Sequence, residues 1–362
     1  MRVVAKIGTS SVTDDSGAID RAAIAKLTGE VAALRGAGHE VLLVSSGAVA
    51  AGVSALGFAA RPADMRTLQA VSAVGQSRMM RVYNDELAGF GIVGAQVLID
   101  PHDFFNRTQY LHARETLVRL LELGCVPVIN ENDAIANDEL RYGDNDRIAA
   151  LVAHSVHADV LVLLTDLEGL YTADPRRDPS AELVRYVDVS DPLLSIQASA
   201  DGSGRGSGGM ASKLAAARIA SWSGVRTVIA RAARPGVLPA AVEGESIGTT
   251  FAGRDRRLPA RKLWIAFAAE TAGSITVDDG ARHALTTRST SLLPAGVRAV
   301  TGNFGEGDTV EVCGLDGVPF ARGMTFVAAA DLRPVVGRHT KDLPEGMVHE
   351  VIHRDDLVVL PD

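Results

Sequence analysis

The sequence is poor in cysteine, in net positive charge and in long apolar runs, and each shortage excludes a class of protein. Only Cys125 and Cys313 occur, far apart in the chain, which argues against a disulfide framework and predicts two buried thiols. Acidic residues outnumber basic ones and give a net charge of −8, so general affinity for nucleic acid is not expected. No apolar run approaches the roughly 18 residues of a membrane-spanning helix.

The start of the chain also lacks a targeting signal. Residues 1–7 enter a strand-like run at once, without the basic and apolar regions of a signal peptide. We therefore expect a cytoplasmic protein without a membrane partner. The length of 362 residues favours two domains, and a content of 47% hydrophobic and 22% charged residues is ordinary for globular chains.

Up to about residue 260, β-branched apolar runs alternate with segments of helical periodicity. This pattern predicts an α/β fold, an open and mostly parallel sheet sandwiched by helices. In the first connection, Asp20 is a candidate N-cap, and Gly36 and Gly38 end the predicted helix. The predicted strands are 3–7, 40–45, 92–99, 126–130, 160–165 and 226–230.

After Arg261 the pattern changes to short alternating runs separated by glycine-rich turns, which predicts a small C-terminal β-rich domain. Its predicted strands include 274–277, 309–313 and 348–352. We place the α/β domain, the linker and the β-rich domain at 1–255, 256–270 and 271–362.

Polar clusters follow four of the predicted strands. In an open parallel sheet, ligands bind beyond the carboxyl ends of the strands, so these clusters should meet at one edge. The clusters are Gly8-Thr9-Ser10, Ser45-Ser46-Gly47-Ala48, Asn130-Glu131-Asn132-Asp133 and Thr165-Asp166.

Two lysines stand out in a chain that holds only five lysines against 31 arginines. Lys6 interrupts a strand that should be buried, where an ammonium group is costly unless it meets an anion. The alternative is an edge strand with Lys6 in solvent. Lys213 lies about one turn inside a predicted helix, 210–223, that follows a glycine-rich loop beginning at Gly202. Such a loop and helix start bind anions, although a flexible surface linker would have a similar composition.

Three familiar motifs fail their context tests. Gly204, Gly206 and Gly209 fit a dinucleotide-binding pattern, but no strand precedes them, and a P-loop sequence is missing. His349 and His353 fit a zinc-binding helix motif, yet their segment alternates like a strand, and we assign no metal ligands. The segment 130–146 instead groups carboxylates and amides, which favours Mg-nucleotide chemistry over a solvated acidic loop.

Taken in order, these motifs resemble the amino acid kinase family over essentially the whole chain. Within the family they are similar to the branch that phosphorylates glutamate at the start of proline synthesis, and the C-terminal part resembles a PUA domain. The resemblance rests on 3–10, 45–48, 73–77, 128–134, 143–146, 164–166, 169–171, 208–210 with Lys213, 292–296 and 302–304.

The resemblance implies a role for each matching residue. Lys6 and Lys213 would contact the ATP phosphates, and Asp146 would organise the two lysines. The implied glutamate-binding residues are Ser46, Asp133 and Asn145. The other implied ATP-binding residues are Gly8, Thr165, Asp166, Ser207, Gly208, Gly209, Met210, Ala211 and Ser212. Serine occupies positions 45, 207 and 212, where threonine is common in the family, so the hydroxyl group is retained.

The resemblance also implies cofactors and partners. ATP and Mg²⁺ are the expected cofactors, L-glutamate the acceptor and proline a feedback inhibitor. We further expect a homo-oligomer, dimer or tetramer, and a glutamyl phosphate reductase that consumes the unstable product. Family members acting on aspartate, acetylglutamate or UMP are one alternative. An RNA-binding PUA protein is another, which the charge of −5 over residues 271–362 disfavours.

Overall fold

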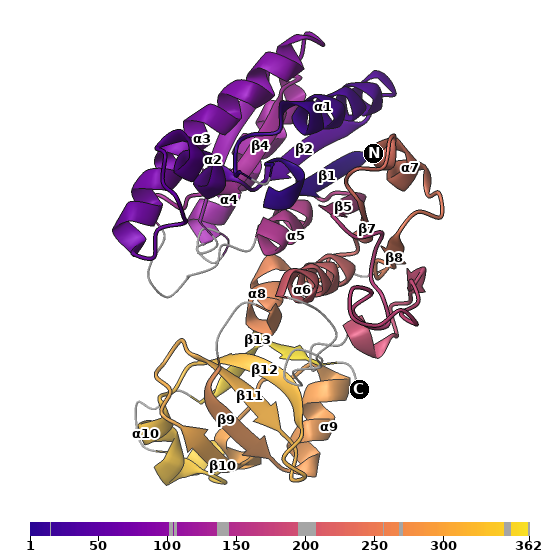
Figure 1. Cartoon of the computed structure of the whole chain (residues 1–362). Helices are drawn as coiled ribbons and strands as arrows, with labels where there is room; N and C mark the ends of the chain where they lie inside the picture. The colour runs from indigo at the N-terminus through magenta and orange to yellow at the C-terminus, as the bar shows by residue number, and fades with distance from the viewer. Residues whose placement is uncertain are drawn as a thin grey trace. The chain divides into compact units, whose positions relative to one another are not determined.

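The structure, a computed structural model, divides into two compact units at Leu258 (Figure 1). In the part of the chain that it describes, no helix combines the length and the apolar character needed to span a membrane. The described residues are 1–14, 16–100, 104, 107–135, 145–194, 208–255, 257–267, 271–343 and 349–360.

The first unit is built on an eight-stranded sheet in the order β3-β4-β2-β1-β5-β7-β8-β6. All of its strand pairings are parallel except that of β7 with β8. The predicted fold class is therefore confirmed. The strands are β1 (Arg2–Ile7), β2 (Glu40–Ser45), β3 (Gly94–Ile99), β4 (Val126–Glu131), β5 (Val160–Thr165), β6 (Tyr186–Val187), β7 (Arg226–Arg231) and β8 (Thr249–Phe251).

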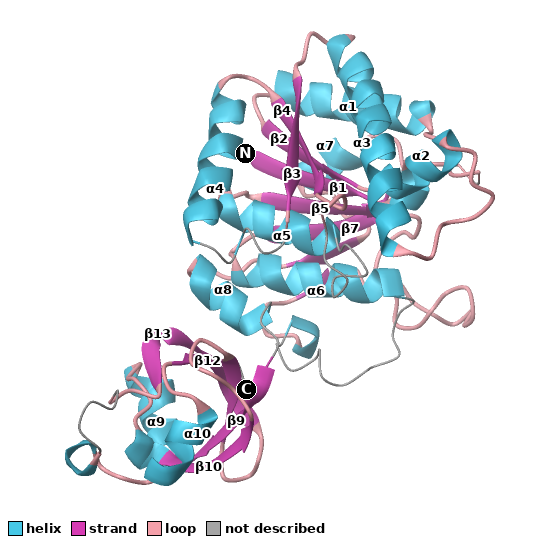
Figure 2. Cartoon of the chain, turned by 90° about the vertical axis from the view of Figure 1, so that its left-hand side faces the viewer, coloured by secondary structure: helices cyan, strands magenta, loops and turns pink. Residues whose placement is uncertain are grey.

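Helices cover both faces of this sheet (Figure 2). On one face α1 contacts α3 and α7, and on the other α5 contacts α4 and α6. Asp20 caps α1 as predicted, because its side chain accepts a hydrogen bond from the Ala23 amide. The helices are α1 (Arg21–Gly36), α2 (Ala48–Ala55), α3 (Met65–Ala88), α4 (Arg107–Glu122), α5 (Asn145–Ser155), α6 (Gly208–Trp222) and α7 (Val237–Glu243).

Five of the six strands predicted for this unit agree with the structure to within one residue. The sixth, 92–99, begins two residues late, at Gly94. Ile92 packs against the hydrophobic core instead of extending the strand, and Gly91 turns the chain just before it with φ of +68°. Cys125, predicted to be buried, is only half-buried, whereas Cys313 in the second unit is buried.

The second unit has its own five-stranded sheet, in the order β10-β9-β11-β12-β13, and its own core. The predicted linker, 256–270, includes helix α8, whose Leu263, Ile265 and Ala266 are buried. The elements are α8 (Ala260–Phe267), β9 (Thr271–Val277), α9 (Asp279–Arg288), β10 (Val297–Gly302), β11 (Thr309–Cys313), β12 (Pro319–Thr325), α10 (Ala329–Leu332) and β13 (Ile352–Val359).

The predicted strand 348–352 is wrong, because β13 begins only at Ile352. Val351 and Ile352 are nevertheless buried, and both form backbone hydrogen bonds with Leu292. The Val351 amide donates to the Leu292 carbonyl at 2.8 Å, and the Leu292 amide donates to the Ile352 carbonyl at 2.8 Å. His353 lies on β13 and His349 precedes it, so the two histidines do not share a helical face.

Candidate active site

The site begins at the carboxyl end of β1, the strand between β2 and β5 in the sheet. Side chains alternate along a strand, so Lys6 points to the same face as Val4, the face that α5 covers. Only 5% of Lys6 is exposed. The alternative of an edge strand with Lys6 in solvent is therefore wrong, and this ammonium group needs a partner inside the protein.

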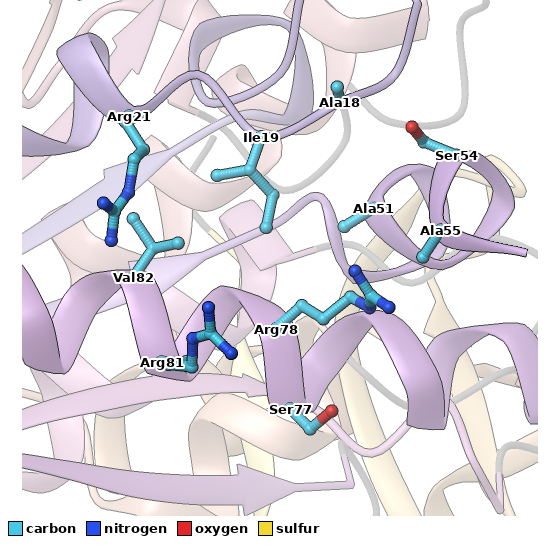
Figure 3. Close-up of a pocket in the computed structure, with 10 residues that line it drawn as sticks. All are labelled: Ala18, Ile19, Arg21, Ala51, Ser54, Ala55, Ser77, Arg78, Arg81 and Val82. Atoms are coloured by element: carbon cyan, nitrogen blue, oxygen red, sulfur yellow. The ribbon is translucent and has the colours of Figure 1, made fainter.

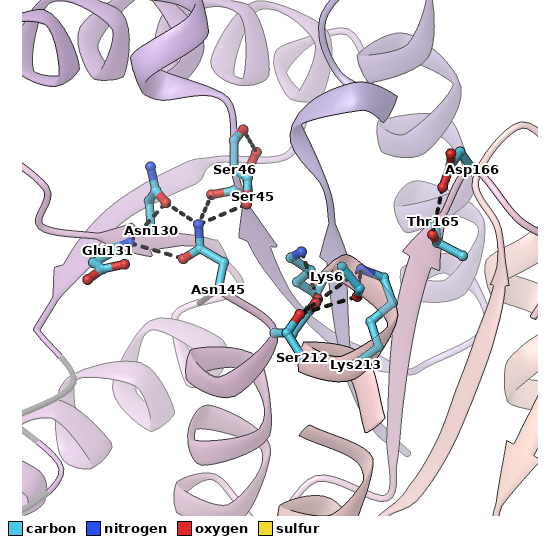
Figure 4. Close-up of polar contacts among 12 residues, drawn as sticks. Lys6, Ser45, Ser46, Asn130, Glu131, Asn145, Thr165, Asp166, Ser212 and Lys213 are labelled. Atoms are coloured by element: carbon cyan, nitrogen blue, oxygen red, sulfur yellow. Dashed lines mark hydrogen bonds and ion pairs between the residues drawn. The ribbon is translucent and has the colours of Figure 1, made fainter. Parts of the chain in front are cut away.

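That partner is Asp146, in the first turn of α5. The same carboxylate also pairs with Lys213 of α6, which lies beside Lys6 (Figure 4). Lys6 Nζ lies 2.7 Å from Asp146 Oδ1, and Lys213 Nζ lies 3.0 Å from Asp146 Oδ2. The Ser212 hydroxyl donates to Oδ2 at 2.7 Å. All three charged groups are at most 7% exposed, so two buried cations share one carboxylate.

The charge balance of this triad is its main chemical property. Burial alone raises the pKa of the Asp146 carboxyl, but the ammonium groups of Lys6 and Lys213 and the Ser212 hydroxyl outweigh it and hold the pKa below its ordinary value. The carboxyl is therefore ionised, and one positive charge is left over. Such a surplus in a poorly solvated place attracts an anion such as phosphate.

The start of α6 adds to this positive end. Lys213 Nζ also donates to the Gly209 carbonyl at 3.2 Å, which ties the lysine to the first turn of its helix. The helix begins at Gly208, two residues before the predicted start. Its N-terminus carries partial positive charge. The predicted ATP contact Ser207 lies outside the described residues.

A second polar cluster lies at the ends of β2 and β4. Asn145 Nδ2 donates to Ser46 Oγ at 2.9 Å and to Asn130 Oδ1 at 2.8 Å (Figure 4). Asn130 Nδ2 in turn donates to Gln76 Oε1 of α3 at 2.7 Å. Because Asn145 and Asp146 are neighbours in α5, this cluster adjoins the lysine pair.

Asp133 lies outside this cluster in the described structure. Its described contact is with the Ser72 hydroxyl, which donates to Oδ2 at 3.3 Å. Burial raises the pKa of the Asp133 carboxyl above its ordinary value. The structure therefore connects two of the three predicted glutamate-binding residues, Ser46 and Asn145, but not Asp133. Other acidic residues of the segment 136–144 lie outside the described residues.

Thr165 and Asp166 end β5 on the opposite side of β1. The Thr165 hydroxyl donates to Asp166 Oδ1 at 3.1 Å, and Asp166 forms an ion pair with Arg176. Burial raises the Asp166 pKa, but the Thr165 hydrogen bond and Arg176 outweigh it and leave the pKa lowered. Both residues line a pocket of about 440 Å³ beyond the ends of β1, β5 and β7.

Gln76 has no role among the residues predicted from the sequence, and Asn130 is predicted only as a member of a polar cluster. A signal for Gln76 was present. Ser72, Gln76 and Tyr83 recur at helical spacing and all are buried on α3. A buried polar stripe on a helix needs hydrogen-bond partners, and here they are Asp133, Asn130 and the Ser45 hydroxyl.

Comparisons with known proteins cover both units. The amino acid kinase family matches residues 1–231, and the PUA domain matches residues 273–347. A glutamate 5-kinase of Myxococcus xanthus is 47% identical over 99% of this chain and 96% of its own length. One of Pelobacter propionicus is 43% identical over 99% of this chain and 97% of its own.

A solved structure, carbamate kinase from Giardia lamblia bound to AMP-PNP, has a TM-score of 0.51 and 17% identity, covering 70% of this chain and 98% of that chain. This likeness concerns the fold alone. The family matches and the high identity along nearly the full length carry the assignment. The chain belongs to the amino acid kinase family, to its glutamate 5-kinase branch, and carries a C-terminal PUA domain.

Proposed function

We propose that this chain transfers the γ-phosphoryl group of ATP to the side-chain carboxylate of L-glutamate, giving L-glutamyl 5-phosphate and ADP, the first step of proline synthesis. The observation that carries the proposal is the buried Lys6–Asp146–Lys213 triad beside a cluster of amide and hydroxyl groups. The glutamate 5-kinase relatives support the choice of acceptor.

On the donor side, the two lysines neutralise the phosphoryl group during transfer. Its equatorial oxygens carry the charge of the transition state, and cations fixed in advance stabilise that charge without reorganising. Asp146 acts as a positioning residue, since it holds both ammonium groups at hydrogen-bond distance. Gly8, Thr165, Asp166 and the segment 207–213 are the proposed nucleotide contacts.

On the acceptor side, Ser46, Asn145 and Asp133 are proposed to hold glutamate. A carboxylate is already a nucleophile, so the reaction needs no general base. The difficulty is bringing one anion up to another, and the site meets it with surplus positive charge and fixed orientation. Hydroxyl and amide donors suit the oxygens of the acceptor carboxylate.

Mg²⁺ fits the site as a partner of the nucleotide more than of the protein. The oxygens of Asp146 are already engaged by two lysines and a hydroxyl, and the described residues hold no group of His, Cys, Asp or Glu arranged for a metal ion. When bound with ATP, Mg²⁺ would neutralise phosphate charge. Lys6 and Lys213 supply the protein's share of that neutralisation.

The proposal extends to regulation and context. Proline, which derives from glutamate, is proposed to compete for the glutamate site. A homo-oligomer, a reductase that consumes the acyl phosphate, and a cytoplasmic location follow from the family and are proposed on that ground.

The direct test measures ADP release from MgATP with hydroxylamine present to trap acyl phosphate as hydroxamate. Glutamate is compared with aspartate, acetylglutamate and UMP as acceptors. Hydroxamate with glutamate alone is the expected result. Turnover with another acceptor would keep the phosphate site and refute the glutamate assignment, and no turnover with any acceptor would refute the kinase activity itself.

A further inference from the structure

A continuous chain of buried amides runs from helix α3 into the proposed glutamate site. It links Gln76, Asn130, Asn145 and the Ser46 hydroxyl through hydrogen bonds of 2.7, 2.8 and 2.9 Å. The three amide side chains are at most 9% exposed. Buried amides this close must agree on which end donates and which accepts at every step, because two donors facing each other would both be unsatisfied.

A backbone amide fixes that direction. The Glu131 N–H can only donate, and it points at Asn130 Oδ1 at 2.9 Å and at Asn145 Oδ1 at 3.3 Å. The oxygens of both asparagines therefore face Glu131. The Nδ2 group of Asn130 is left to face Gln76, which must present its oxygen, and the Nδ2 group of Asn145 faces Ser46.

The direction of the chain decides what Ser46 offers to a ligand. Because Ser46 Oγ accepts from Asn145, its own hydroxyl proton points elsewhere, and in the described structure it has no other acceptor. A hydroxyl in this state donates, and a carboxylate oxygen is an acceptor only. Ser46 is thus set to recognise the carboxylate form of a substrate.

We propose that Gln76 is a positioning residue for this reaction, acting through Asn130 on Asn145 and Ser46; this inference rests on the proposed function. Without an acceptor at position 76, the Asn130 Nδ2 group would be buried and unsatisfied. Asn130 then relieves that cost by rotating, and Asn145 loses the acceptor that holds its amide toward Ser46. Among the described hydrogen bonds, Gln76 itself contacts no group proposed to bind substrate, and it is joined to Asn145 through Asn130 by two hydrogen bonds.

The test uses two substitutions in the full chain, with KM for glutamate and for MgATP measured separately. Gln76→Met keeps the size of the side chain but removes the amide oxygen, and should raise the KM for glutamate by about tenfold with the KM for MgATP nearly unchanged. Gln76→Glu keeps an acceptor and should stay within about threefold of the parent chain. Asn84→Met, which changes an exposed amide on the same helix, is the matched control.

Three results would overturn the inference: equal changes in both KM values, no change in Gln76→Met, or Gln76→Glu as impaired as Gln76→Met. Matched thermal unfolding of all variants excludes a folding defect. The proposed function fails separately, through the parent chain. If the parent chain turns over a different carboxylate acceptor, the KM for that acceptor tests Gln76 equally well.

A separate observation concerns a pocket of about 630 Å³ between α2, α3 and the segment that precedes α1 (Figure 3). Its described lining combines three guanidinium groups and two hydroxyls with small apolar side chains, and contains no carboxylate. The lining residues are Ala18, Ile19, Arg21, Ala51, Ser54, Ala55, Ser77, Arg78, Arg81 and Val82.

The charges in this pocket are poorly compensated. Arg78 and Arg81 lie one turn apart on α3, and neither has an ion-pair or hydrogen-bond partner among the described residues. Arg21, the first residue of α1, pairs through Nη2 with Asp85 at 2.8 Å and extends toward the same space as Arg81 (Figure 3). The three side chains are exposed, so solvent screens part of their mutual repulsion, and an anion bound between them would relieve the rest.

We infer that this pocket binds a small phosphate-bearing anion, for which guanidinium forks and hydroxyl donors are suited. The probe is pyrophosphate, titrated calorimetrically at constant ionic strength into the full chain. The double variant Arg78→Ser, Arg81→Ser should lose one class of sites while the class contributed by Lys6 and Lys213 remains. Arg66→Ser, which removes an exposed charge from the same helix outside the pocket, should bind as the parent does. An unchanged titration in the double variant would refute the site.

Discussion

Lys213 and Lys6 share one carboxylate, but their positions suit them to different moments of the reaction. Lys6 sits on a rigid central strand, whereas Lys213 lies in the first turns of a helix that follows the glycine-rich loop. A cation fixed beside the partial positive charge of a helix start stabilises the phosphoryl group most when its negative charge develops. We therefore assign Lys213 mainly to the transition state.

Replacing Lys213 with alanine should lower kcat by about 100-fold or more and leave the KM for glutamate nearly unchanged. The reason is that the lysine stabilises the transferring phosphoryl group and not the bound acceptor. Steady-state kinetics with varied glutamate measures both constants. Lys341→Ala, at an exposed lysine of the second unit, is the control. A large rise in KM with unchanged kcat would place Lys213 in acceptor binding instead.

Asp146→Asn should destabilise the fold by roughly 3–5 kcal/mol near neutral pH, because two buried ammonium groups lose their common counter-charge. The native pKa of this carboxyl lies below its ordinary value of 3.8. Its stabilisation is therefore complete above that value and is lost as the pH falls through the lower native pKa. Denaturant unfolding of both chains from pH 7 to pH 3 should show their difference shrinking only at the acid end.

The control for this prediction is Glu122→Gln, which breaks the exposed pair with Arg119 and should cost about 0–1 kcal/mol. A difference between parent and Asp146→Asn that stays constant down to pH 3 would contradict the assigned direction of the pKa shift.

His154 gives the stability of the fold a second dependence on pH, between about pH 4 and pH 6.5 and so above the range in which Asp146 acts. Burial, with help from nearby cationic groups, lowers the pKa of this imidazole to about 4, although it lies in the last turn of α5 where a cation is otherwise favoured. The native histidine is therefore neutral at pH values where an unfolded one, with a pKa near 6.5, takes up a proton. Its contribution is complete above about pH 6.5 and is lost progressively toward pH 4.

The parent chain should lose about 3 kcal/mol from this group between pH 6.5 and pH 4, and His154→Asn should lose correspondingly less. Denaturant midpoints measured across that interval test it. His112→Asn, at an exposed histidine on α4, should retain the full slope. If the slope is the same in His154→Asn as in the parent, the buried imidazole is not its source.

At the residue scale, the roles of charged side chains could be predicted from the sequence better than those of buried amides. Lys6 could be singled out because an ammonium group in a buried strand needs an anionic partner, whereas the role of Asp146 came only from the family resemblance. Gln76 offered no such contradiction. Its helical spacing with Ser72 and Tyr83 indicates a polar stripe on α3, but a glutamine is tolerated on either face of a helix, so its partner becomes visible only in its hydrogen bond with Asn130 of β4.

Among the elements, α2 and α3 are in close backbone contact at two glycines, Gly52 and Gly75. A Cβ atom on Gly75 would lie 1.7 Å from the Ala48 carbonyl oxygen, and one on Gly52 would lie 1.9 Å from the Val71 carbonyl oxygen. Both positions therefore require glycine. Since α2 begins directly after Ser46 and Gly47, this contact also fixes where the proposed glutamate site stands relative to α3.

Gly75→Ala should force the two helices apart, with a cost of roughly 1–3 kcal/mol and a raised KM for glutamate. Thermal unfolding and glutamate titrations of the same preparation measure both effects. Gly36→Ala, where the added Cβ meets no atom within 4 Å, should be unchanged or slightly more stable. An unaffected KM in a destabilised Gly75→Ala would show that the helix contact does not position the site.

Element prediction succeeded where one physical cause acted alone. The central strands β2 and β5 are buried on both faces, and their bounds follow directly from their apolar runs. It failed at the start of 92–99, because Ile92 is partly buried by packing against the core and not by strand pairing. It failed at 348–352, because the pairing there is a single isolated bridge between Leu292 and Ile352. Helix α8 was missed because its Pro259 and charged flank indicate a linker equally well.

At the scale of the whole molecule, the hydrophobic clusters described for the two units have no residue in common. The change of pattern after Arg261 predicted a second unit, since short alternating runs with glycine-rich turns differ from the helical periodicity before them. The short strands β6 and β8 were not predicted, because two or three residues hold no periodicity to detect.

Separate cores predict separate unfolding. Leu285 on α9 is 2% exposed in the second core, and Leu285→Ala should cost about 2–5 kcal/mol there through the cavity it leaves. Calorimetry should show the transition of the second unit moving down while that of the first stays in place, and kinase turnover below the shifted transition should be unaffected. Leu117→Ala, at a buried position of the first unit, should do the reverse and abolish turnover on mild heating. If a single transition moves in both variants, the two units unfold as one cooperative body, and the prediction of separate unfolding is wrong.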